Sequence, residues 1–214
     1  MKIIIPYREN STRCIGKNLR DFYNGKSILD ITIEKFIGND VILASVPSET
    51  TKEVALNHKC NTIDLQEEDD GWSELFYEIA TKLEAGQDEP VCIWTATEIT
   101  YFINNNVSDF LRFGEKELRE NNKTTSLVRK LKHFLLDENF QPENFSPGPW
   151  HPYSQQLKQK YIVGWASVTT KRKMLKYRYC WGPSAAIYVA KDPYIDIDTE
   201  EEFKISQALW SLYD

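Results

Sequence analysis

The fold of this chain is decided by its opening stretch, residues 2–18, which reads KIIIPYRENSTRCIGKN. Three consecutive isoleucines followed by a proline are typical of a short buried strand, because a strand covered on both faces is apolar throughout and a proline ends it. The polar loop that follows, residues 7–18, carries Arg8, Arg13 and Lys17. The stretch therefore predicts a strand that leads into a cationic loop.

Strand and helix patterns alternate along the rest of the chain. Ser27 and Asp30 have the spacing of a capping box, which predicts the start of a helix. The other predicted elements are strands over residues 41–45, 60–65, 90–94, 164–169 and 185–190, and helices over 49–57, after Trp72, over 107–118 and from about Thr199. Repeated strand–helix units indicate an α/β fold with a mainly parallel sheet in three layers.

The composition is that of one folded domain spanning residues 1–214. Hydrophobic residues make up 41% and charged residues 27% of the chain, which excludes a disordered protein. The net charge of −6 argues against a globally basic surface for nucleic acid. The four cysteines form no C-x-x-C pair, and no apolar run approaches the roughly 20 residues of a membrane span. We therefore expect a cytoplasmic protein that binds neither nucleic acid nor membranes.

The loop after the first strand has the composition of a phosphate-binding loop. Its polar donors are Arg8, Ser11, Arg13, Lys17 and Asn18. In an open α/β sheet such a loop lies at the carboxyl edge of the strands, where ligands commonly bind. Arginine can grip phosphate oxygens with its fork, and lysine supplies a movable point charge. The alternative is an ordinary solvated loop, since the stretch is neither a Walker A motif nor a G-x-G-x-x-G loop.

A second candidate site lies in residues 194–203, which read YIDIDTEEEF. In an extended segment, Asp196 and Asp198 project to the same side. Two such carboxylates suit Mg²⁺, which proteins usually hold with one or two carboxylates and substrate phosphates. The alternative for Asp198 is a structural role as N-cap of the last helix, with Glu201 at the capping-box position.

Two further regions carry weaker signals. Four of the nine prolines lie between Pro142 and Pro152, which predicts an extended excursion that interrupts the strand–helix order. The basic cluster within residues 158–178 can meet an anionic partner, or its interleaved aromatic residues can pack into a core or dimer contact. The three histidines are far apart, so the sequence indicates no histidine metal site or catalytic triad.

Residues 3–19, IIIPYRENSTRCIGKNL, resemble the opening signature of the acylneuraminate cytidylyltransferases, or CMP-sialic acid synthetases, which reads roughly I-I-P-A-R-x-x-S-K-x-x-x-x-K-N. Residues 194–203 resemble the terminal D-I-D-T-x-x-D-F segment of the same family, and both motifs occur in family order. Residues 155–157, QQL, are similar to the family's R-Q-D-L region. The resemblance therefore spans the whole chain.

The resemblance implies a Rossmann-like nucleotidyltransferase fold and a homodimer, with a protruding dimerisation segment at about residues 130–160. The implied reaction transfers CMP from CTP to the hydroxyl group of an acidic, nonulosonic sugar and releases pyrophosphate. The implied site comprises catalytic Arg8 and Lys17, nucleotide-binding Arg8, Ser11, Arg13, Lys17, Asn18 and Ser73, sugar-binding Gln155, and Mg²⁺-binding Asp196 and Asp198. The cationic loop and the magnesium ion would stabilise the negative charge that develops on the transferred phosphate and on pyrophosphate.

The sequence also departs from the family pattern. Thr12 replaces the lysine of S-K, and Arg13 is the neighbouring cation that can substitute for it. Residues 44–46, ASV, replace S-T-D; residues 94–98, WTATE, lack the usual final proline; and Ser154 replaces the arginine of R-Q. These departures leave two alternatives. One is a catalytically inactive homologue that binds a nucleotide or sugar or serves as an assembly subunit, and the other is an active enzyme for a different sugar or nucleotide.

Overall fold

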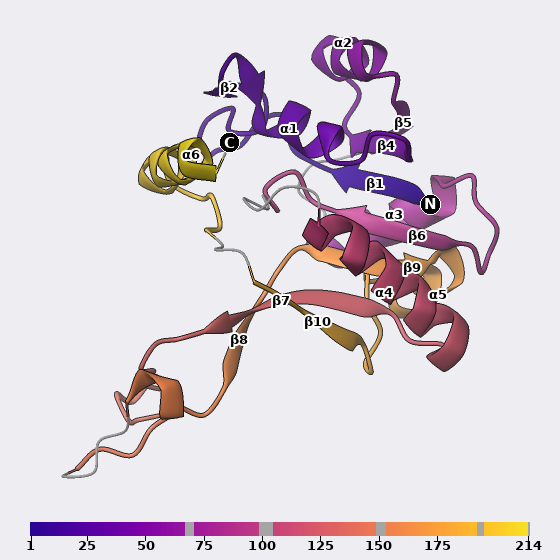
Figure 1. Cartoon of the computed structure of the whole chain (residues 1–214). Helices are drawn as coiled ribbons and strands as arrows, with labels where there is room; N and C mark the ends of the chain where they lie inside the picture. Colours follow the sequence, from indigo (N-terminus) through magenta and orange to yellow (C-terminus); the bar gives the residue numbers. More distant parts are fainter. Residues whose placement is uncertain (67–70, 99–104, 149–152, 192–194, 214) are drawn as a thin grey trace.

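The computed structural model describes residues 1–66, 71–98, 105–148, 153–191 and 195–213 (Figure 1). The elements of this part of the chain are, in order, β1 (Lys2–Pro6), β2 (Asp21–Tyr23), β3 (Lys26–Ser27), α1 (Ile28–Glu34), β4 (Asp40–Ser45), α2 (Glu49–His58), β5 (Asn61–Asp64), α3 (Gly71–Lys82), β6 (Pro90–Trp94), α4 (Asn105–Asn121), β7 (Thr125–Leu131), the 3-10 helix η1 (Ser154–Gln156), β8 (Lys160–Val163), β9 (Ala166–Thr170), α5 (Lys171–Tyr177), β10 (Ala186–Ala190) and α6 (Glu200–Tyr213).

The central sheet has five strands in the order β5-β4-β1-β6-β9. β1 pairs in parallel with β4 and β6, and β4 pairs in parallel with β5, whereas β9 runs antiparallel to β6. The three isoleucines of β1 are fully buried, as expected for a strand in the middle of a sheet that is covered on both faces. The predicted mainly parallel sheet is confirmed.

A hydrophobic core lies on each face of the central sheet, between the strands and the helices that cover that face. One core contains Ile3 and Ile5 of β1 together with residues of α1, α4 and α6. The other contains Ile4 of β1 together with residues of α3 and α5. Neighbouring residues of a strand point to opposite faces, so the sequence of β1 serves both cores. The three-layer α/β fold is confirmed (Figure 1).

The local signals at the start of α1 are also confirmed. The backbone N–H of Asp30 donates to Ser27 Oγ at 3.1 Å, and the backbone N–H of Ser27 donates to Asp30 Oδ2 at 2.8 Å, which closes the predicted capping box. Among the described helices, none is both long enough and apolar enough to cross a membrane.

Helix α5 lies within the basic cluster, over residues for which the sequence predicts no helix. Arg172 donates two hydrogen bonds to the Asp88 carboxylate at 2.8 and 2.9 Å, and Lys173 donates to the backbone carbonyl of Asn122 at 2.9 Å. Arg178 pairs with Glu74 of α3. These basic side chains therefore contact acidic and carbonyl groups of their own chain.

A second, three-stranded sheet with the order β10-β7-β8 lies beside the first. β10 runs parallel to β7, and β8 runs antiparallel to it, with Val128 opposite Val163 and Leu131 opposite Lys160. The two strands β7 and β8 lead away from the central sheet, so the described segments between them, residues 132–148 and 153–159, project as an arm (Figure 1). Residues 149–152, with two of the four prolines, lie outside the described part of the arm.

Candidate functional site

The loop after β1 contacts the segment before α6, so the two candidate sites form one cluster. Arg13 Nη1 lies 2.7 Å from Asp198 Oδ2, and Lys17 Nζ lies 3.2 Å from Asp198 Oδ1. Lys17 also donates to the backbone carbonyl of Ile197. The Arg13 side chain is 71% exposed and the Lys17 side chain only 12%, so solvent weakens the first ion pair more than the second. Lys17 is therefore the principal contact between the two ends of the chain.

The start of α6 directs the Asp198 carboxylate toward these cations. The backbone N–H of Glu202 donates to Thr199 Oγ1 at 3.2 Å, and the backbone N–H of Thr199 donates to Glu202 Oε2 at 2.8 Å. Thr199 and Glu202 thus form the capping box of α6. The alternative in which Asp198 caps the helix with Glu201 is wrong by one residue, because Thr199 takes the capping position and leaves the Asp198 carboxylate to the loop.

A second contact joins the same two segments. Arg20 Nη2 lies 2.7 Å from Glu200 Oε2, and its guanidinium carbon lies 3.8 Å from the centre of the Phe203 ring. An arginine over an aromatic face gains a cation–π interaction in addition to its ion pair. Cys14 is buried beside this pair, and burial raises the pKa of its thiol. The first turn of α6 is therefore fixed against the loop.

Turns shape the rest of the loop. Gly16 adopts a φ of +62°, and its carbonyl accepts hydrogen bonds from the backbone N–H groups of Leu19 and Arg20 at 3.0 Å. The buried Asn18 donates through Nδ2 to the backbone carbonyl of Arg8 at 2.8 Å. Asn18 therefore holds the loop from inside, while the Arg8 side chain is exposed and Ser11 is half-buried.

Asp196 is half-buried next to Asp198. Burial raises the pKa of Asp196 above its ordinary value, and the charge of Asp198 raises it further, whereas the charge of Lys17 and the polar N–H group of the Trp165 side chain lower it. A carboxylate that is partly withdrawn from water beside a second carboxylate gains from a bound cation. The pair therefore has the electrostatics of a cation ligand set.

Trp165 is held at the edge of the central sheet by its backbone, and no motif in the sequence indicates it. Its backbone N–H donates to Glu98 Oε2 at 2.7 Å, and its carbonyl accepts from the backbone N–H of Thr95 at 3.1 Å. Glu98 is fully buried, and its Oε1 lies 2.6 Å from Arg129 Nη1. The signal that could have drawn attention to this region is the unusual WTATE stretch, because Thr95 and Glu98 both belong to it.

The two carboxylates fit a magnesium ion that is bound together with a nucleotide. Nowhere in the described ranges do three or more His, Cys, Asp or Glu side chains gather around one point, so these residues build no complete protein cage. Magnesium needs no such cage, since it commonly takes one or two carboxylates and completes its shell with water and phosphate oxygens. Asp196 and Asp198 carry hard oxygen atoms of this kind, and Lys17 and Arg13 place two cations beside them.

Two predicted site residues lie apart from this cluster. Ser73 is exposed in the first turn of α3, next to Trp72, whose ring stacks on that of Trp165 with centroids 4.6 Å apart. Gln155 is exposed in η1, within the arm. Because the arm projects away from the central sheet (Figure 1), Gln155 does not join the cluster of its own chain.

Known proteins resemble the chain along its whole length. A family model described as cytidylyltransferase matches residues 2–192, which include the cationic loop and end before Asp196. Similar solved structures include CMP:2-keto-3-deoxy-manno-octonic acid synthetase complexed with CTP, with 15% identity, 98% of each chain covered and a TM-score of 0.64. HddC from Yersinia pseudotuberculosis complexed with GMP-PN has 15% identity, 100% of this chain and 99% of that chain covered and a TM-score of 0.61. The 2-C-methyl-D-erythritol 4-phosphate cytidylyltransferase of Francisella tularensis has 13% identity, 97% and 99% coverage and a TM-score of 0.66.

These likenesses differ in what they establish. At such low identities, the solved structures show a shared fold. No functionally curated protein matches the sequence. The family match, in contrast, is a match of sequence, and it covers nearly all of the chain. The chain therefore belongs to the cytidylyltransferase family, whose members are CTP-using nucleotidyltransferases.

Proposed function

We propose that this protein transfers CMP from CTP to the hydroxyl group of a sugar and releases pyrophosphate. The observation that carries the proposal is the contact of Lys17 and Arg13 with Asp198, which brings two cations and two carboxylates together. A nucleoside triphosphate with its metal ion needs both, because the phosphates bind cations and the metal binds carboxylates. Membership of the cytidylyltransferase family supports CTP as the nucleotide.

The cluster suggests an exchange of partners when the nucleotide binds. Magnesium, held by Asp196 and Asp198, would act as a Lewis acid on phosphate oxygens. Lys17 and Arg13 would then leave Asp198 for the triphosphate, and the exposed Arg8 would add a third cation. These positive side chains would stabilise the negative charge that builds on the α-phosphate and on pyrophosphate as the bond between them breaks. The sugar hydroxyl attacks directly, so no protein nucleophile is required.

The acceptor that we propose is a nonulosonic, sialic-acid-like sugar. The resemblance of residues 3–19 and 194–203 to the acylneuraminate cytidylyltransferases supports it. One of the similar structures is likewise named for a CMP-linked acidic sugar, whereas HddC was captured with a guanine nucleotide analogue. Both the sugar and the base therefore need direct tests.

We further propose a homodimer in which the arm and its sheet meet a second copy. Residues that are directly opposite each other on paired strands point to the same face of a sheet. Val128 of β7 is opposite both Val189 of β10 and Val163 of β8, so these three valines lie on one side of the β10-β7-β8 sheet. Ile187 and Tyr161, two residues earlier on their strands, share that side. The side chains of Ile187, Val189, Tyr161 and Val163 are between 43% and 50% exposed, which is typical of a surface that packs on a partner. A second copy could also bring Gln155 of its arm near the cluster.

Light scattering during gel filtration tests the dimer. We expect a mass of twice the 25.0 kDa of one chain. A wild-type mass of 25.0 kDa at micromolar concentration contradicts the dimer but does not contradict the proposed reaction. The variant Val189→Lys is expected to give a monomer, because it places a charge on the apolar face that would pack on the partner.

Pyrophosphate release tests the reaction. CTP, UTP, GTP and ATP are each incubated with N-acetylneuraminic acid or 2-keto-3-deoxy-manno-octonic acid, with magnesium or with EDTA. We expect release that requires a sugar and magnesium and that is fastest with CTP. Release with another base corrects the nucleotide, and the absence of release with every pair contradicts the proposed reaction.

A second candidate is a homologue that binds a nucleotide without turnover. The observation that favours it is Thr12, which leaves Arg13 as the neighbouring cation, and Arg13 is largely exposed. Thermal stabilisation by CTP without pyrophosphate release is the result expected of this candidate, because any ligand that binds only the native state raises stability.

A further inference from the structure

One tryptophan side chain faces solvent beside the candidate site. Trp72, in the first turn of α3, is 41% exposed, and no other tryptophan of the described ranges belongs to the exposed large apolar side chains. Tryptophan is usually highly buried, because its large ring gains more than most side chains from leaving water. The exposed indole of Trp72 therefore presents a flat apolar surface on which a ligand can pack.

Two other rings hold Trp72 in place. Its ring stacks on that of Trp165, with centroids 4.6 Å apart and an angle of 11° between the planes. It also stacks on Phe76, one turn later on α3, with centroids 5.6 Å apart and an angle of 22°. Phe76 is 1% exposed, so this support is anchored in the core. A side chain that is already fixed loses little conformational freedom when a ligand packs on it, so Trp72 is a preorganised aromatic surface.

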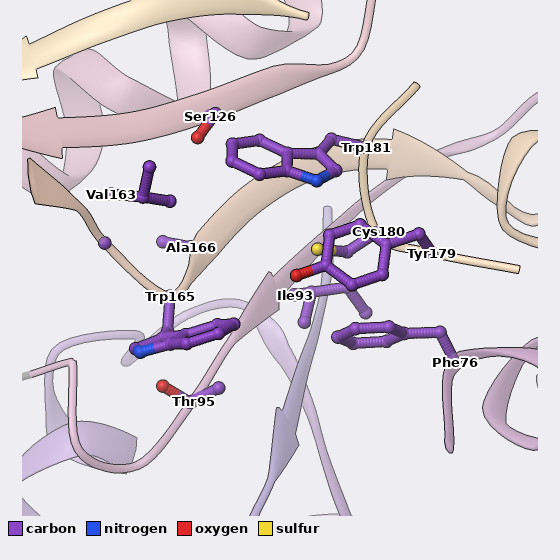
Figure 2. Close-up of a pocket in the computed structure, with 11 residues that line it drawn as sticks. Phe76, Ile93, Thr95, Ser126, Val163, Trp165, Ala166, Tyr179, Cys180 and Trp181 are labelled. Carbon is purple, nitrogen blue, oxygen red and sulfur yellow. The ribbon is translucent and has the colours of Figure 1, made fainter. Parts of the chain in front are cut away.

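The space on the inner side of the two supporting rings is closed to a ligand. Figure 2 shows Trp165 and Phe76 on one side of a cavity and Trp181 on the opposite side. The cavity has room for about one water molecule, so no ring of a ligand fits there. Trp72 does not line this cavity. A ligand ring can therefore pack on Trp72 from the solvent side but cannot enter between Trp165 and Trp181.

The topology places Trp72 on the same edge of the central sheet as the cationic loop. β1, β4 and β5 are parallel, and the loop with Lys17 follows β1 while α3 follows β5. Both segments therefore lie at the carboxyl edge of the sheet, where ligands of open α/β sheets commonly bind. β9 runs antiparallel to β6, with Ala166 opposite Trp94, so Trp165 just before β9 lies at this edge as well.

Trp165 lies between Trp72 and the candidate metal ligands. Burial raises the pKa of Asp196, and the polar N–H group of the Trp165 side chain acts against this rise, so the indole lies close to that carboxyl group. The ring of the same side chain stacks on Trp72. A nucleotide has a matching order of parts, because its ribose separates the phosphates from the base. With the phosphates at Lys17 and Asp196, the base can extend to Trp72.

A nucleobase suits this surface better than the acceptor sugar does. A base is flat, aromatic and uncharged at neutral pH, so it can stack in parallel on the indole. The acceptor sugar, in contrast, must reach the α-phosphate with its hydroxyl group, and Trp165 separates Trp72 from the carboxylates that would bind the metal. The exposed ring is therefore placed for the end of the nucleotide that does not react.

We propose that Trp72 is the stacking platform for the base of the bound nucleotide, with Trp165 and Phe76 as the positioning residues that hold it. This proposal rests on the proposed function for the presence of a nucleotide at the cluster. Because every base has an aromatic face, Trp72 would strengthen the binding of a nucleotide without selecting cytosine.

Calorimetric titration in the absence of a sugar tests the proposal without requiring turnover. The probes are CTP and inorganic tripolyphosphate, each added with magnesium to the full chain. We expect Trp72→Ala to weaken CTP binding about tenfold to a hundredfold, the loss typical of one base–aromatic stack, and to leave the affinity for tripolyphosphate unchanged. Trp72→Phe, which keeps an aromatic face, should recover most of the affinity for CTP.

Tyr77→Ala is the matched control. Tyr77 lies on the same helix and is 38% exposed, but its ring lies under the guanidinium group of Arg178, at 4.4 Å. We expect this variant to bind both CTP and tripolyphosphate like the wild type.

Three results would overturn the platform. They are an unchanged affinity for CTP in Trp72→Ala, an equal loss of affinity for CTP and tripolyphosphate, which indicates a structural role, and a loss confined to the KM for N-acetylneuraminic acid, which assigns the ring to the sugar. Pyrophosphate release by the wild type keeps the proposed reaction in each of these cases. Conversely, a loss of CTP affinity alone in Trp72→Ala, without pyrophosphate release from the wild type with any pair, supports the platform and rejects the proposed reaction.

Discussion

Arg129 Nη1 and Glu98 Oε1 lie 2.6 Å apart, with side chains that are 5% and 0% exposed. This buried ion pair lies under the turn that carries Trp165, because Glu98 also accepts the Trp165 backbone N–H at 2.7 Å. Gly164 is required beside it, since a Cβ there would lie 2.7 Å from Glu98 Oε2 and 3.0 Å from Arg129 Nη1. The pair therefore joins β7 to the loop after β6 at the edge of the candidate site.

Breaking this pair from one side should be costly. We predict that Arg129→Met lowers the free energy of unfolding by about 3 to 5 kcal/mol, because it removes the cation that faces the buried Glu98 carboxylate. Urea denaturation measures the loss. The double variant Arg129→Met with Glu98→Leu should recover much of it, and a loss below about 1 kcal/mol in the single variant contradicts the buried-pair assignment.

The principal effect of replacing Lys17 should be on the reaction with CTP. We predict that Lys17→Met lowers kcat/KM for CTP about a hundredfold or more, as expected when a group that opposes developing charge is removed. Steady-state pyrophosphate release measures this effect. Lys52→Met is the matched control, because Lys52 forms an exposed ion pair with Glu49 on α2 and should keep wild-type kinetics. Equal kinetics in the two variants would remove Lys17 from the proposed site.

Two substitutions distinguish the Thr199–Glu202 cap of α6 from the alternative cap formed by Asp198 and Glu201. We predict that Thr199→Ala costs about 1 kcal/mol of stability, because it removes the side chain that accepts the Glu202 N–H. Glu201→Ala, at the position that the alternative cap would use, should change stability by less than about 0.5 kcal/mol. Thermal unfolding of both variants measures the difference, and the reverse order would restore Asp198 as the cap.

Acid should weaken the fold partly through Asp30 at the start of α1. Burial alone would raise the pKa of Asp30, but hydrogen bonds from Ser27 and a 2.7 Å contact with His58 lower it overall. Since the native pKa is depressed, the unfolded chain binds the proton more readily. The stabilisation is therefore present above the unfolded value of about 3.9 and is lost as the pH falls through the native pKa.

We predict that Asp30→Asn lowers stability at neutral pH and flattens its decline in acid. Urea denaturation from about pH 3 to about pH 7 measures this slope. Asp109→Asn, on the exposed side of α4, is the control and should keep the wild-type slope. A slope that Asp30→Asn leaves unchanged would contradict the role of Asp30.

The sequence was sufficient for the elements whose signals are local. The three isoleucines of β1, the Ser27–Asp30 capping box and the apolar strand 90–94 each fix an element through neighbouring residues, and the structure places each as predicted. β7 and α5 were missed. β7 combines buried serine and threonine with Arg129, whose burial depends on Glu98 from another strand's loop. Helix α5 is short and mostly basic, with Met174 as its one buried residue, so its apolar pattern is too brief to predict a helix and it also depends on partners such as Asp88.

The candidate site shows the same limit. Lys17, Arg13 and Asp198 are residue types that indicate phosphate and metal chemistry. Their meeting depends on how the loop after β1 packs against the segment before α6, because Lys17 and Asp198 are 181 positions apart in the sequence. Trp165 has no motif, because its position comes from a buried ion pair and from stacking on Trp72, both of which are tertiary contacts. The shift of the α6 cap to Thr199 arises from a choice between adjacent residues that pattern alone does not resolve.

A crystal structure of the protein with CTP and magnesium would show whether the two ends of the chain form one nucleotide site. We expect triphosphate oxygens within hydrogen-bond reach of Lys17 and Arg13, and a magnesium ion on Asp196 and Asp198 that also contacts the phosphates. A triphosphate bound elsewhere, or bound with Lys17 and Arg13 still paired to Asp198, would contradict it.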